Sequence, residues 1–462
     1  SSVSAAHWEE SWSPDEIRRL APAHVMSTWG PSSVIRDLPI ISHGEGCYLF
    51  DTDGNRYLDW TSQAICTNLG YDVPEAVQSA VSRQLSRLPM VYGGLGNTEV
   101  RVRLARLLSE LLPGDINGFL FPCSGSEANE AAIRIARRFT GRHKIMTHYR
   151  SYHGGSAGSL AATGDFRRGF SESGGASSSG FVKTMNPTDS QLFNFGSTDE
   201  ERTRMALGYL EEQMQCEGPS SIAAVMLESV VGSGGVLTAP PGYMEGVRAL
   251  CDKHGILMIA DEVMVGFGRT GKFWGFQNYD FLPDIVTSAK GLTAAFMPLS
   301  MVAVRQPIKE YFETNALGWG STFQAHPVSL AAGYECVKFM LERDLVHRSK
   351  TVIEPIMKAQ ISRLVAKYDS VASGRAVGAF GCLDLVDTRT GAPIQNFDGS
   401  NCSNPSAIAA FKAALRSNGL YGFVRPPKFH CAPALVIEPS ELEDGFRRAD
   451  KALEVYDKAL RA

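Results

Sequence analysis

The chain has 462 residues, of which 44% are hydrophobic and 20% are charged, so it is long enough to bury two or three separate cores. A net charge of −4 provides no basic field for nucleic acid or an anionic membrane, and no apolar run reaches the roughly 18 residues of a transmembrane helix. Nine scattered cysteines without a CxxC pair favour reduced thiols.

The first 70 residues predict a segment that joins a smaller lobe. Residues 44–59 have the pattern of a β-hairpin, with Asp53 and Gly54 in its turn. The first residues contain no apolar h-region, and no arginine precedes Arg18, so they resemble neither a secretory nor a transit peptide. We therefore expect a cytoplasmic protein, or one of an organelle matrix if a presequence has been removed.

Strands and helices alternate through the middle of the chain. The candidate strands cover 119–122, 144–148, 181–185, 222–229, 256–261, 285–288 and 299–304. Helical stretches fall between several of these strands, and this alternation is typical of a parallel sheet covered on both faces. The predicted fold class is α/β, with a large domain at 71–330 built on a mostly parallel seven-stranded sheet.

The remaining segments predict a second, smaller α+β domain. It would comprise residues 331–462, with amphipathic helices at 405–418 and 440–460 and short strands near 380–386 and 430–437, and residues 1–70 would contribute to it. Serine and glycine dominate residues 171–180, which predicts a mobile surface loop. A plain connector is the preferred role of this loop, and a lid is the alternative.

Asp261 and Lys290 are the most informative pair of residues in the chain. Each follows an apolar, β-branched run, so each is expected at the carboxyl end of a strand, where open α/β sheets bind ligands. A lysine can hold an aldehyde cofactor covalently, and an acid can keep a pyridine nitrogen protonated. This combination suits pyridoxal phosphate.

Gly125 and Ser126 follow a predicted strand and open a predicted helix, so their N–H groups are candidates for binding a phosphate. An ordinary helix cap is the alternative. Tyr152 could lay its ring against a flat cofactor, although a buried Tyr-His pair would more often be structural. His148 and His153 have no third ligand at a useful spacing, so no metal is expected.

Two further polar residues stand where they could serve the same site. Glu228 ends a predicted strand and would point into the same crevice, with a structural ion pair as the alternative. Thr322 lies in a turn-rich stretch and could complete a phosphate site, with an ordinary loop threonine as the alternative.

Taken together, these motifs resemble the class III aminotransferases, the ω-aminotransferase family of fold type I pyridoxal-phosphate enzymes. The resemblance covers about residues 35–460. It rests on four elements in order, namely Ser124–Asn129, Tyr152–Gly154, Asp261–Gly271 and Ser288–Lys290.

The resemblance implies a role for each candidate. Lys290 would bind the cofactor and move the substrate proton, and Asp261 would pair with the pyridine nitrogen. The residues expected around the cofactor are Gly125, Ser126, Tyr152, His153, Glu228, Val263 and Thr322. Tyr152 and Val263 would enclose the ring. Thr322 would come from the neighbouring subunit, which implies a homodimer with shared active sites, and tetramers remain an alternative.

The substrate side is also read from the resemblance. Met264 stands where many members have glutamine, and an apolar residue there is common in the pyruvate-using branch. Arg425 would bind a substrate carboxylate, with a surface salt bridge as the alternative. Trp29 and Tyr92 would wall the pocket. We expect transfer from taurine, β-alanine, 4-aminobutyrate or a primary amine to a 2-oxo acid, with pyruvate preferred.

Other functions remain open at this stage. An aminomutase or a decarboxylating enzyme could use the same scaffold, and a binding protein could keep the fold without turnover. The presence of both Lys290 and Asp261 disfavours the binding protein. A nicotinamide dehydrogenase is disfavoured because no GxGxxG follows an early strand.

Overall fold

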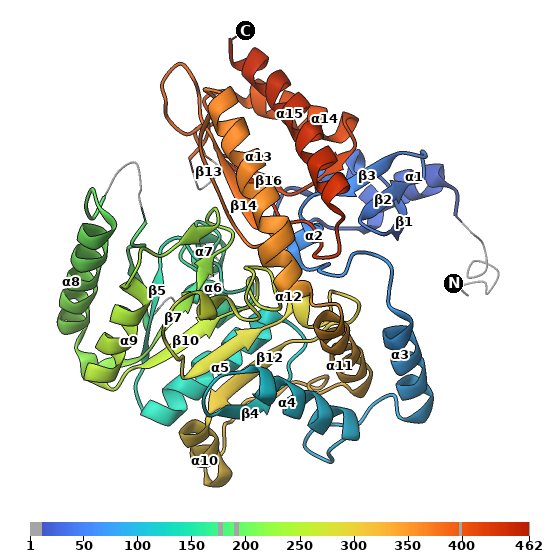
Figure 1. Cartoon of the computed structure of the whole chain (residues 1–462). Coiled ribbons are helices and arrows are strands. Elements are labelled where there is room, and N and C mark those ends of the chain that lie inside the picture. The colour runs from blue at the N-terminus through green and yellow to red at the C-terminus, as the bar shows by residue number, and fades with distance from the viewer. Residues whose placement is uncertain (1–11, 174–178, 189–193, 397–399, 462) are drawn as a thin grey trace.

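The structure, a computed structural model, describes residues 12–173, 179–188, 194–396 and 400–461. A seven-stranded sheet fills one lobe, and smaller sheets with long helices form the other (Figure 1). The seven strands are, in sheet order, β4 (Ile116–Leu120), β12 (Met301–Arg305), β11 (Ile285–Ser288), β10 (Leu257–Asp261), β7 (Ile222–Glu228), β5 (Lys144–His148) and β6 (Phe181–Thr184).

The mostly parallel α/β sheet predicted from the sequence is confirmed. β10 pairs in parallel with β7 and β11, whereas β12 runs antiparallel to both of its neighbours. All seven predicted strands are present, with ends shifted by up to three residues. Every residue of β7 is buried, because helices cover both faces of the sheet, and such strands become continuous apolar runs.

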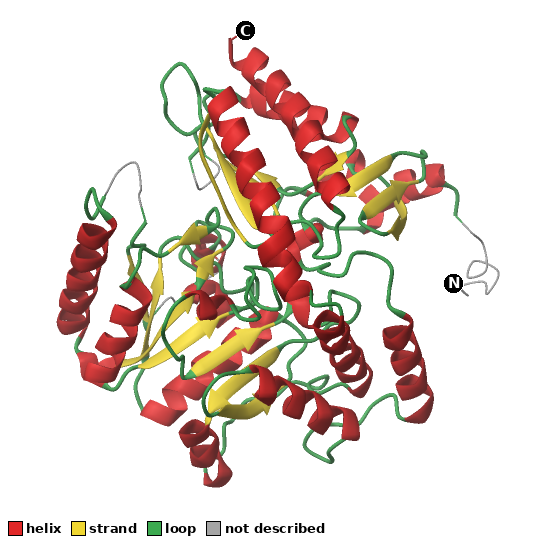
Figure 2. Cartoon of the chain, viewed as in Figure 1, coloured by secondary structure: helices red, strands yellow, loops and turns green. Residues whose placement is uncertain are grey.

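Helices flank this sheet (Figure 2). α5 (Gly125–Thr140) lies across β7, β10, β11 and β12 and buries an alanine-rich face that permits close packing on the sheet. The other helices of this part are α3 (Glu75–Arg87), α4 (Glu99–Leu111), α6 (Ala157–Ala162), α7 (Arg168–Ser173), α8 (Asp199–Glu217), α9 (Tyr243–His254), α10 (Gln306–Thr314) and α11 (Pro327–Glu342). Short elements between them are β8 (Val230–Val231), β9 (Leu237–Thr238), η3 (Pro219–Ser221), η4 (Gly275–Asn278) and η5 (Lys290–Leu292).

The N-terminal hairpin is formed by β2 (Tyr48–Asp51) and β3 (Arg56–Asp59), with β1 (Ile41–Glu45) beside β2. The Asp51 carboxylate fixes the turn, since it accepts hydrogen bonds from the backbone N–H groups of Asp53 and Asn55. β3 also pairs with β15 (Leu420–Tyr421), which joins the two ends of the chain in one sheet. α1 (Pro14–His24), η2 (Ser32–Asp37) and α2 (Ser62–Ile65) flank this hairpin in the sequence.

A third sheet contains β13 (Val371–Val377), β14 (Phe380–Leu385), β17 (Lys428–Cys431) and β16 (Val424–Arg425). The predicted strand at 430–437 is wrong beyond Cys431. Pro433 has no N–H to donate, and the N–H groups of Ala432 and Leu435 bond instead to the carbonyls of Trp60 and Asn68. The helices of this part are α12 (Leu345–Arg348), η6 (Ser349–Ile353), α13 (Glu354–Lys367), α14 (Pro405–Ser417) and α15 (Pro439–Arg461).

The side chain of Arg269 connects the lobes. It is completely buried, and its Nη1 donates to the carbonyls of Ala379 and Pro433 at 3.0 and 2.5 Å. Its Nη2 lies 2.7 Å from Oδ1 of Asn68. Burial lowers the pKa of Arg269 only to about 10, so it stays charged at neutral pH. Part of the Asp261–Gly271 motif therefore serves to hold the N-terminal and C-terminal segments on the large sheet.

The domain division at residues 70 and 330 stays a prediction. The second boundary falls inside α11, a helix that packs against α3 and α4. Of the predicted loop at 171–180, residues 171–173 are the last residues of α7, while residues 174–178 lie outside the described residues. The nine cysteines all lie in the described part, and none of them forms a disulfide.

Candidate active site

Asp261 and Lys290 meet at the carboxyl edge of the large sheet. Asp261 ends β10 and is the register partner of Thr287 in β11, and Lys290 follows the end of β11 by two residues. Lys290 has a φ of +35°, a rare conformation for a residue with a side chain and one that clusters at functional sites. Burial lowers the pKa of its amine, and nearby acidic groups, Asp261 among them, oppose that shift. A lowered pKa makes the amine a better nucleophile near neutral pH.

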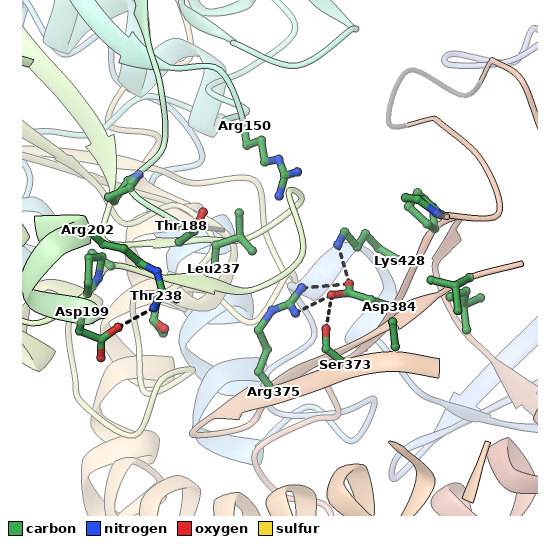
Figure 3. A pocket seen from close by; sticks show the side chains of 18 of the residues that line it. Arg150, Thr188, Asp199, Arg202, Leu237, Thr238, Ser373, Arg375, Asp384 and Lys428 are labelled. Atoms are coloured by element: carbon green, nitrogen blue, oxygen red, sulfur yellow. Dashed lines mark hydrogen bonds and ion pairs between the residues drawn. The ribbon is translucent and has the colours of Figure 1, made fainter. Parts of the chain in front are cut away.

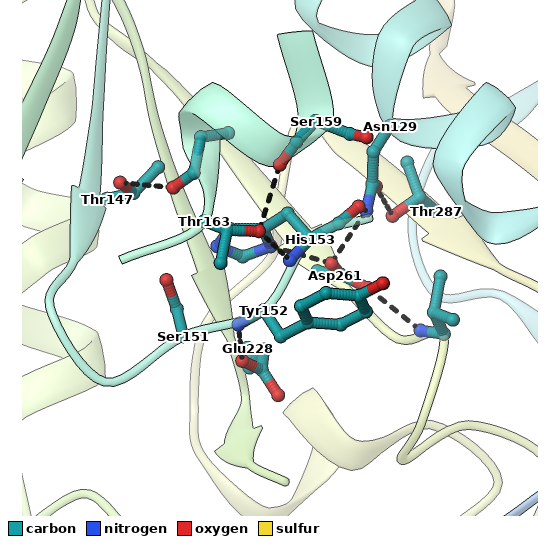
Figure 4. Close-up of polar contacts among 12 residues, drawn as sticks. Asn129, Thr147, Ser151, Tyr152, His153, Ser159, Thr163, Glu228, Asp261 and Thr287 are labelled. Carbon is teal, nitrogen blue, oxygen red and sulfur yellow. Dashed lines mark hydrogen bonds and ion pairs between the residues drawn. The ribbon is translucent and has the colours of Figure 1, made fainter. Parts of the chain in front are cut away.

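Three donors hold the Asp261 carboxylate in place (Figure 4). His153 Nδ1 lies 2.7 Å from Oδ2, Asn129 Nδ2 lies 2.8 Å from the same oxygen, and the N–H of Val263 lies 3.0 Å from Oδ1. The Asn129 amide oxygen in turn accepts from the hydroxyl of Thr287 at 2.7 Å. Because all these side chains are fixed by packing and hydrogen bonds, the Asp261 carboxylate is held in one orientation at the edge of the sheet.

The start of α5 has the properties of a phosphate site. Ser124 caps the helix, and the N–H groups of Gly125 and Ser126 stand at the first two positions, where a helix has no internal acceptor. A Cβ at Gly125 would lie 2.8 Å from Val263 Cγ1, so only glycine fits beside this valine. Ser126 Oγ accepts the N–H of Gly155 at 3.0 Å, which fixes its hydroxyl at the helix start.

Glu228 lies beside this group as the register partner of Asp261 in β7. Its two carboxylate oxygens accept the N–H groups of Tyr152 and Gly232 at 2.9 and 2.8 Å, and no ion pair of Glu228 occurs in the described chain. Burial raises its pKa to about 7. The structural ion pair, which was the alternative reading of Glu228, is absent from the described residues, and Glu228 instead binds the backbone N–H groups of Tyr152 and Gly232. Its expected role beside the cofactor stays a prediction.

Aromatic side chains and arginines form the wall next to Tyr152. The Tyr152 ring lies edge-on to Trp29, with 6.1 Å between the centroids, and the guanidinium of Arg167 covers it at 3.6 Å. Arg167 is buried and bonds through Nε to both oxygens of Asp165 at 3.0 Å. Arg425 lies over Phe166 at 5.4 Å, on the same side of the site. Trp29 and Arg425 therefore lie near Tyr152, and their role in binding substrate stays a prediction.

Two predicted residues are not brought to this cluster within the single chain. Tyr92 is 46% exposed, and its ring packs beside Gly94 instead of against Trp29 or Tyr152. Thr322 is exposed, and the neighbouring Phe323 is 60% exposed. A residue that serves a site in another subunit would be exposed in this way, so the role of Thr322 stays a prediction.

Sequence reasoning missed four residues of the site: Asn129, Thr287, Asp165 and Arg167. Asn129 carried a signal, because a fully buried amide on an alanine-rich helix face needs a partner. Asp165 and Arg167 carried none, because they lie in an irregular segment between α6 and α7 whose path the sequence does not specify.

Two further classes of site were tested in the described residues. No group of three or more His, Cys, Asp or Glu side chains there is arranged to hold a metal ion. None of the helices in this part combines the length and the apolar character that crossing a membrane requires.

Comparison with known proteins identifies the family. A model of the class-III aminotransferases matches residues 33–453. The chain is a class-III aminotransferase. A solved taurine:2-oxoglutarate aminotransferase from Bifidobacterium kashiwanohense, in complex with PLP and glutamate, is 37% identical with a TM-score of 0.90, and the match covers 97% of this chain and 99% of that one.

Two other relatives agree with this assignment. An (S)-enantioselective ω-transaminase from Thermomicrobium roseum is 30% identical with a TM-score of 0.89. The match covers 97% of this chain and 100% of that one. The putrescine–pyruvate aminotransferase of Pseudomonas aeruginosa is 29% identical over 434 residues, 92% of each chain. This aminotransferase therefore has the fold type I architecture and uses pyridoxal phosphate.

The residues at the carboxyl edge of the large sheet fit that cofactor. A lysine amine, a rigid carboxylate and a glycine-opened helix start occupy the carboxyl edge of one sheet. A Cβ at Gly154 would lie 2.6 Å from Ser126 Oγ, so this glycine also keeps space open next to the helix start. We assign Lys290 to covalent attachment, Asp261 to the ring nitrogen, and Gly125 with Ser126 to the phosphate, as expected roles.

Proposed function

We propose that this aminotransferase moves an amino group from a short ω-amino acid or primary amine to a 2-oxo acid, with pyruvate as the acceptor. Arg425 carries the proposal. Its Nη1 is buried without a hydrogen-bond partner in the described chain, and none of the ion pairs of this part includes Arg425. Burial and the neighbouring Arg167 lower its pKa to about 10, so it remains a cation at neutral pH. A half-buried cation without a counter-ion suits an incoming carboxylate.

Arg167 supports this assignment by contrast. Its charge is already neutralised by Asp165, its Nη2 lies 3.0 Å from Ser233 Oγ, and its guanidinium is stacked on Tyr152. Arg167 therefore shapes the wall, and Arg425 is left to bind the substrate anion. Phe423 and Phe166 flank the Arg425 guanidinium at 5.3 and 5.4 Å, which leaves its edge for a bidentate contact with a carboxylate.

The chemistry follows from the positions of two side chains, Asp261 and Lys290. Bound pyridoxal phosphate supplies an electron sink for the bond that breaks at the substrate carbon. Asp261 keeps a fixed negative charge at the far edge of the site, held by His153 and Asn129. The Lys290 amine would be the base that removes the proton from the substrate carbon and later returns it. The same residues serve donor and acceptor in turn, which predicts ping-pong kinetics.

The acceptor is the finer part of the proposal. Pyruvate is supported by Met264, whose side chain is packed against Gly232 and presents an apolar group near the cofactor-binding strand. A second candidate is 2-oxoglutarate, because a relative that is 37% identical is a taurine:2-oxoglutarate aminotransferase. The two acceptors differ by a second carboxylate, which would need a second cation, and Arg167 is already paired.

A donor and acceptor panel tests the proposal. Taurine, β-alanine, 4-aminobutyrate and a primary amine are each paired with pyruvate and with 2-oxoglutarate, and the alanine or glutamate formed is measured. We expect alanine from at least one ω-amino acid or amine. A strong preference for 2-oxoglutarate contradicts the pyruvate part. Turnover of an amino acid without any oxo acid would instead indicate an aminomutase or a decarboxylating enzyme.

We also propose that the active site is completed by a second copy of the chain. Thr322 and Phe323 are exposed, and the carbonyl of Phe323 accepts from Cys123 Sγ at 3.4 Å, next to the phosphate-binding start of α5. This loop therefore lies near the start of α5, and Thr322 is exposed on it. A homodimer in which Thr322 reaches the partner's phosphate is consistent with that exposure.

A further inference from the structure

A groove of about 470 Å³ lies in the smaller lobe between α14 and the turn that follows β3. Its volume is in the range of sites for small organic ligands. The walls come from α14, from β15 with residues 422–424 after it, and from the turn at residues 61–64. The lining residues all belong to the described chain, and none of them is acidic, whereas two are cations, Lys412 and Arg416.

These two cations have no counter-ion among the described residues. They stand four positions apart on α14, so both side chains project from the same side of the helix. Both are exposed. Within the described chain, Lys412 takes part in no hydrogen bond or ion pair, and the Arg416 guanidinium contacts only the carbonyl of Asp37, at 3.5 Å. Two cations without a neighbouring acid give the groove a positive potential.

A larger cavity of about 900 Å³ between the lobes differs in this respect (Figure 3). There the Asp384 carboxylate binds both Arg375, at 2.7 and 3.1 Å, and Lys428, at 2.5 Å. Those two cations already have a carboxylate partner in the wall itself. The groove beside α14 presents cations alone, so an anion from solution would be the first counter-ion that they meet.

Phe423 forms the border between the groove and the proposed carboxylate site. It lines the groove, and its ring centroid lies 5.3 Å from the guanidinium carbon of Arg425. The hydroxyl of Thr61 accepts the N–H of Phe423 at 3.0 Å and donates to the carbonyl of Gln63 at 2.9 Å, which fixes this border to the turn on the other wall. A carboxylate in the groove is therefore separated from Arg425 by one aromatic side chain.

The turn at residues 61–64 leads in the other direction to Lys290. Ala64 lines the groove, and Cys66 follows it by two residues. Burial raises the pKa of the Cys66 thiol, and the charge of the nearby Lys290 amine opposes this shift. Gln63 has a φ of +57°, a strained conformation of the kind that clusters at functional sites. The walls of the groove thus continue into the segments that approach Lys290 and Arg425.

We propose that this groove is an entry site for the 2-oxo acid acceptor, whose carboxylate pairs with Lys412 and Arg416 before it passes Phe423 to reach Arg425. The inference rests on the proposed binding of the acceptor carboxylate at Arg425. A carboxylate matches both guanidinium and ammonium donors. An amine donor is itself a cation and gains nothing from a positive potential. The groove would therefore favour the acceptor over the donor in the second half of the ping-pong cycle.

The first test measures kcat/KM for pyruvate and for 2-oxoglutarate at several ionic strengths. Lys412→Gln and Arg416→Gln should each lower kcat/KM for the oxo acid that is turned over by about 3-fold at low salt, the effect of one exposed charge. The loss should disappear at about 0.5 M salt, because exposed charges are then screened. The value of kcat at saturating oxo acid, and kcat/KM for a primary amine, should stay within about twofold of those of the unaltered protein.

Charge-preserving variants and a distant lysine provide the controls. Lys412→Arg and Arg416→Lys keep the charge and should retain the original kcat/KM for the oxo acid. Lys253→Gln should have no effect at any ionic strength, because Lys253 is an exposed helical lysine of the large lobe that pairs with Glu211. An equal loss for oxo acid and amine, a loss that persists at high salt, or no loss in either glutamine variant would overturn the proposal.

A second measurement does not depend on turnover. The purified holoenzyme, with its cofactor in the form that carries no amino group, is treated with acetic anhydride at increasing pyruvate concentrations, and the acetylated lysines are identified by peptide mapping. We expect the acetylation rate of Lys412 to fall by about half at half occupancy of the groove. The rate at Lys253 should stay constant. A rate at Lys412 that does not respond to pyruvate contradicts the entry site.

Arg425→Ala separates the failure of this inference from the failure of the proposed function. If Arg425→Ala leaves KM for the oxo acid unchanged, the proposed carboxylate contact at Arg425 is wrong, and with it the passage of the acceptor from the groove to Arg425. If Arg425→Ala raises that KM while Lys412 is not protected by pyruvate, only the entry site is wrong. Protection of Lys412 in both the unaltered protein and Arg425→Ala supports the groove as a binding site that acts before Arg425.

Discussion

The imidazole of His153 is hydrogen-bonded to the carboxylate of Asp261, with Nδ1 2.7 Å from Oδ2 and both side chains buried. The two residues are 108 positions apart in the chain and meet because β5 and β10 both border β7. Asn129 contacts the same carboxylate oxygen from α5. Asp261 therefore has a fixed orientation before any ligand binds, which is the condition for effective electrostatic stabilisation.

Removing that support should reduce the rate without changing substrate affinity. We expect His153→Gln to lower kcat by about 10-fold to 100-fold, the cost of one hydrogen bond to a charged group, while KM for donor and acceptor stays unchanged. Steady-state kinetics with saturating cofactor measures both constants. His148→Gln is the matched control, since His148 is equally buried and contacts Tyr243 at 3.1 Å instead. Equal losses of kcat in both variants would contradict a specific role for His153.

Lys290→Ala should abolish turnover, with a fall of at least about 10³-fold, because the variant has neither the covalent attachment nor the base. The cofactor should still bind, since Asp261 and the start of α5 remain. Equilibrium dialysis measures this binding. Borohydride reduction of the unaltered protein, followed by peptide mapping, should place the cofactor on Lys290. A label on another lysine, or retained turnover in the variant, would refute the assignment.

Arg425→Ala should raise KM for the 2-oxo acid by about 10-fold or more, because a bidentate charge-assisted contact is lost. KM for a primary amine donor, which has no carboxylate, should stay within a factor of two of the original value. Initial rates at varied acceptor and at varied amine separate the two effects. Arg447→Ala is the control, because Arg447 is 63% exposed and pairs only with Asp444 in the described chain. An equal rise in both KM values would argue against carboxylate binding by Arg425.

The shared site can be tested by complementation between two inactive chains. Thr322→Glu should repel the cofactor phosphate, and Lys290→Ala removes the amine. If Thr322 serves the partner's site, a mixed dimer of the two variants has one intact site, and coexpression should restore about a quarter of the normal activity. If both residues act within one chain, the mixture stays inactive. Size-exclusion chromatography of the same samples checks that dimers are present.

The buried carboxyl of Glu228 predicts a pH dependence of stability. Its ordinary pKa of 4.5 is raised to about 7, so the folded protein holds this proton more tightly than the unfolded chain. The contribution of the Glu228 proton to the free energy of unfolding is therefore complete below about pH 4.5. It is lost as the pH rises to about 7, by up to about 3 kcal/mol. Glu228→Gln should flatten Tm against pH over this window, measured by calorimetry. An unchanged slope, or the same flattening in the exposed control Glu443→Gln, would contradict it.

Much of the large lobe was predictable from the sequence for one physical reason. Strands covered on both faces become apolar runs, so all seven strands could be predicted. The acid that ends one strand and the lysine that follows another could then be assigned to one edge of the sheet. The start of α5 could be predicted because a capping serine and a glycine precede an alanine-rich helix face. These features depend on residues close together in the chain.

Contacts between distant segments were not predictable. The ends of β17 depend on bonds from Ala432 and Leu435 to the N-terminal region, and the sequence has no local sign of them. The pairing of Arg167 with Asp165 over Tyr152 depends on the path of an irregular segment.

The sequence by itself determined where the reactive residues stand relative to the strands: an acid at the end of one buried strand and a lysine after the next. It could do so because burial and turn preferences are local. Only the tertiary structure decided which polar groups satisfy one another, since hydrogen bonds and charges act over a few ångströms between residues that can be a hundred positions apart. The contact of His153 with Asp261 and the contacts of Arg269 between the two lobes both join residues that are distant in the chain.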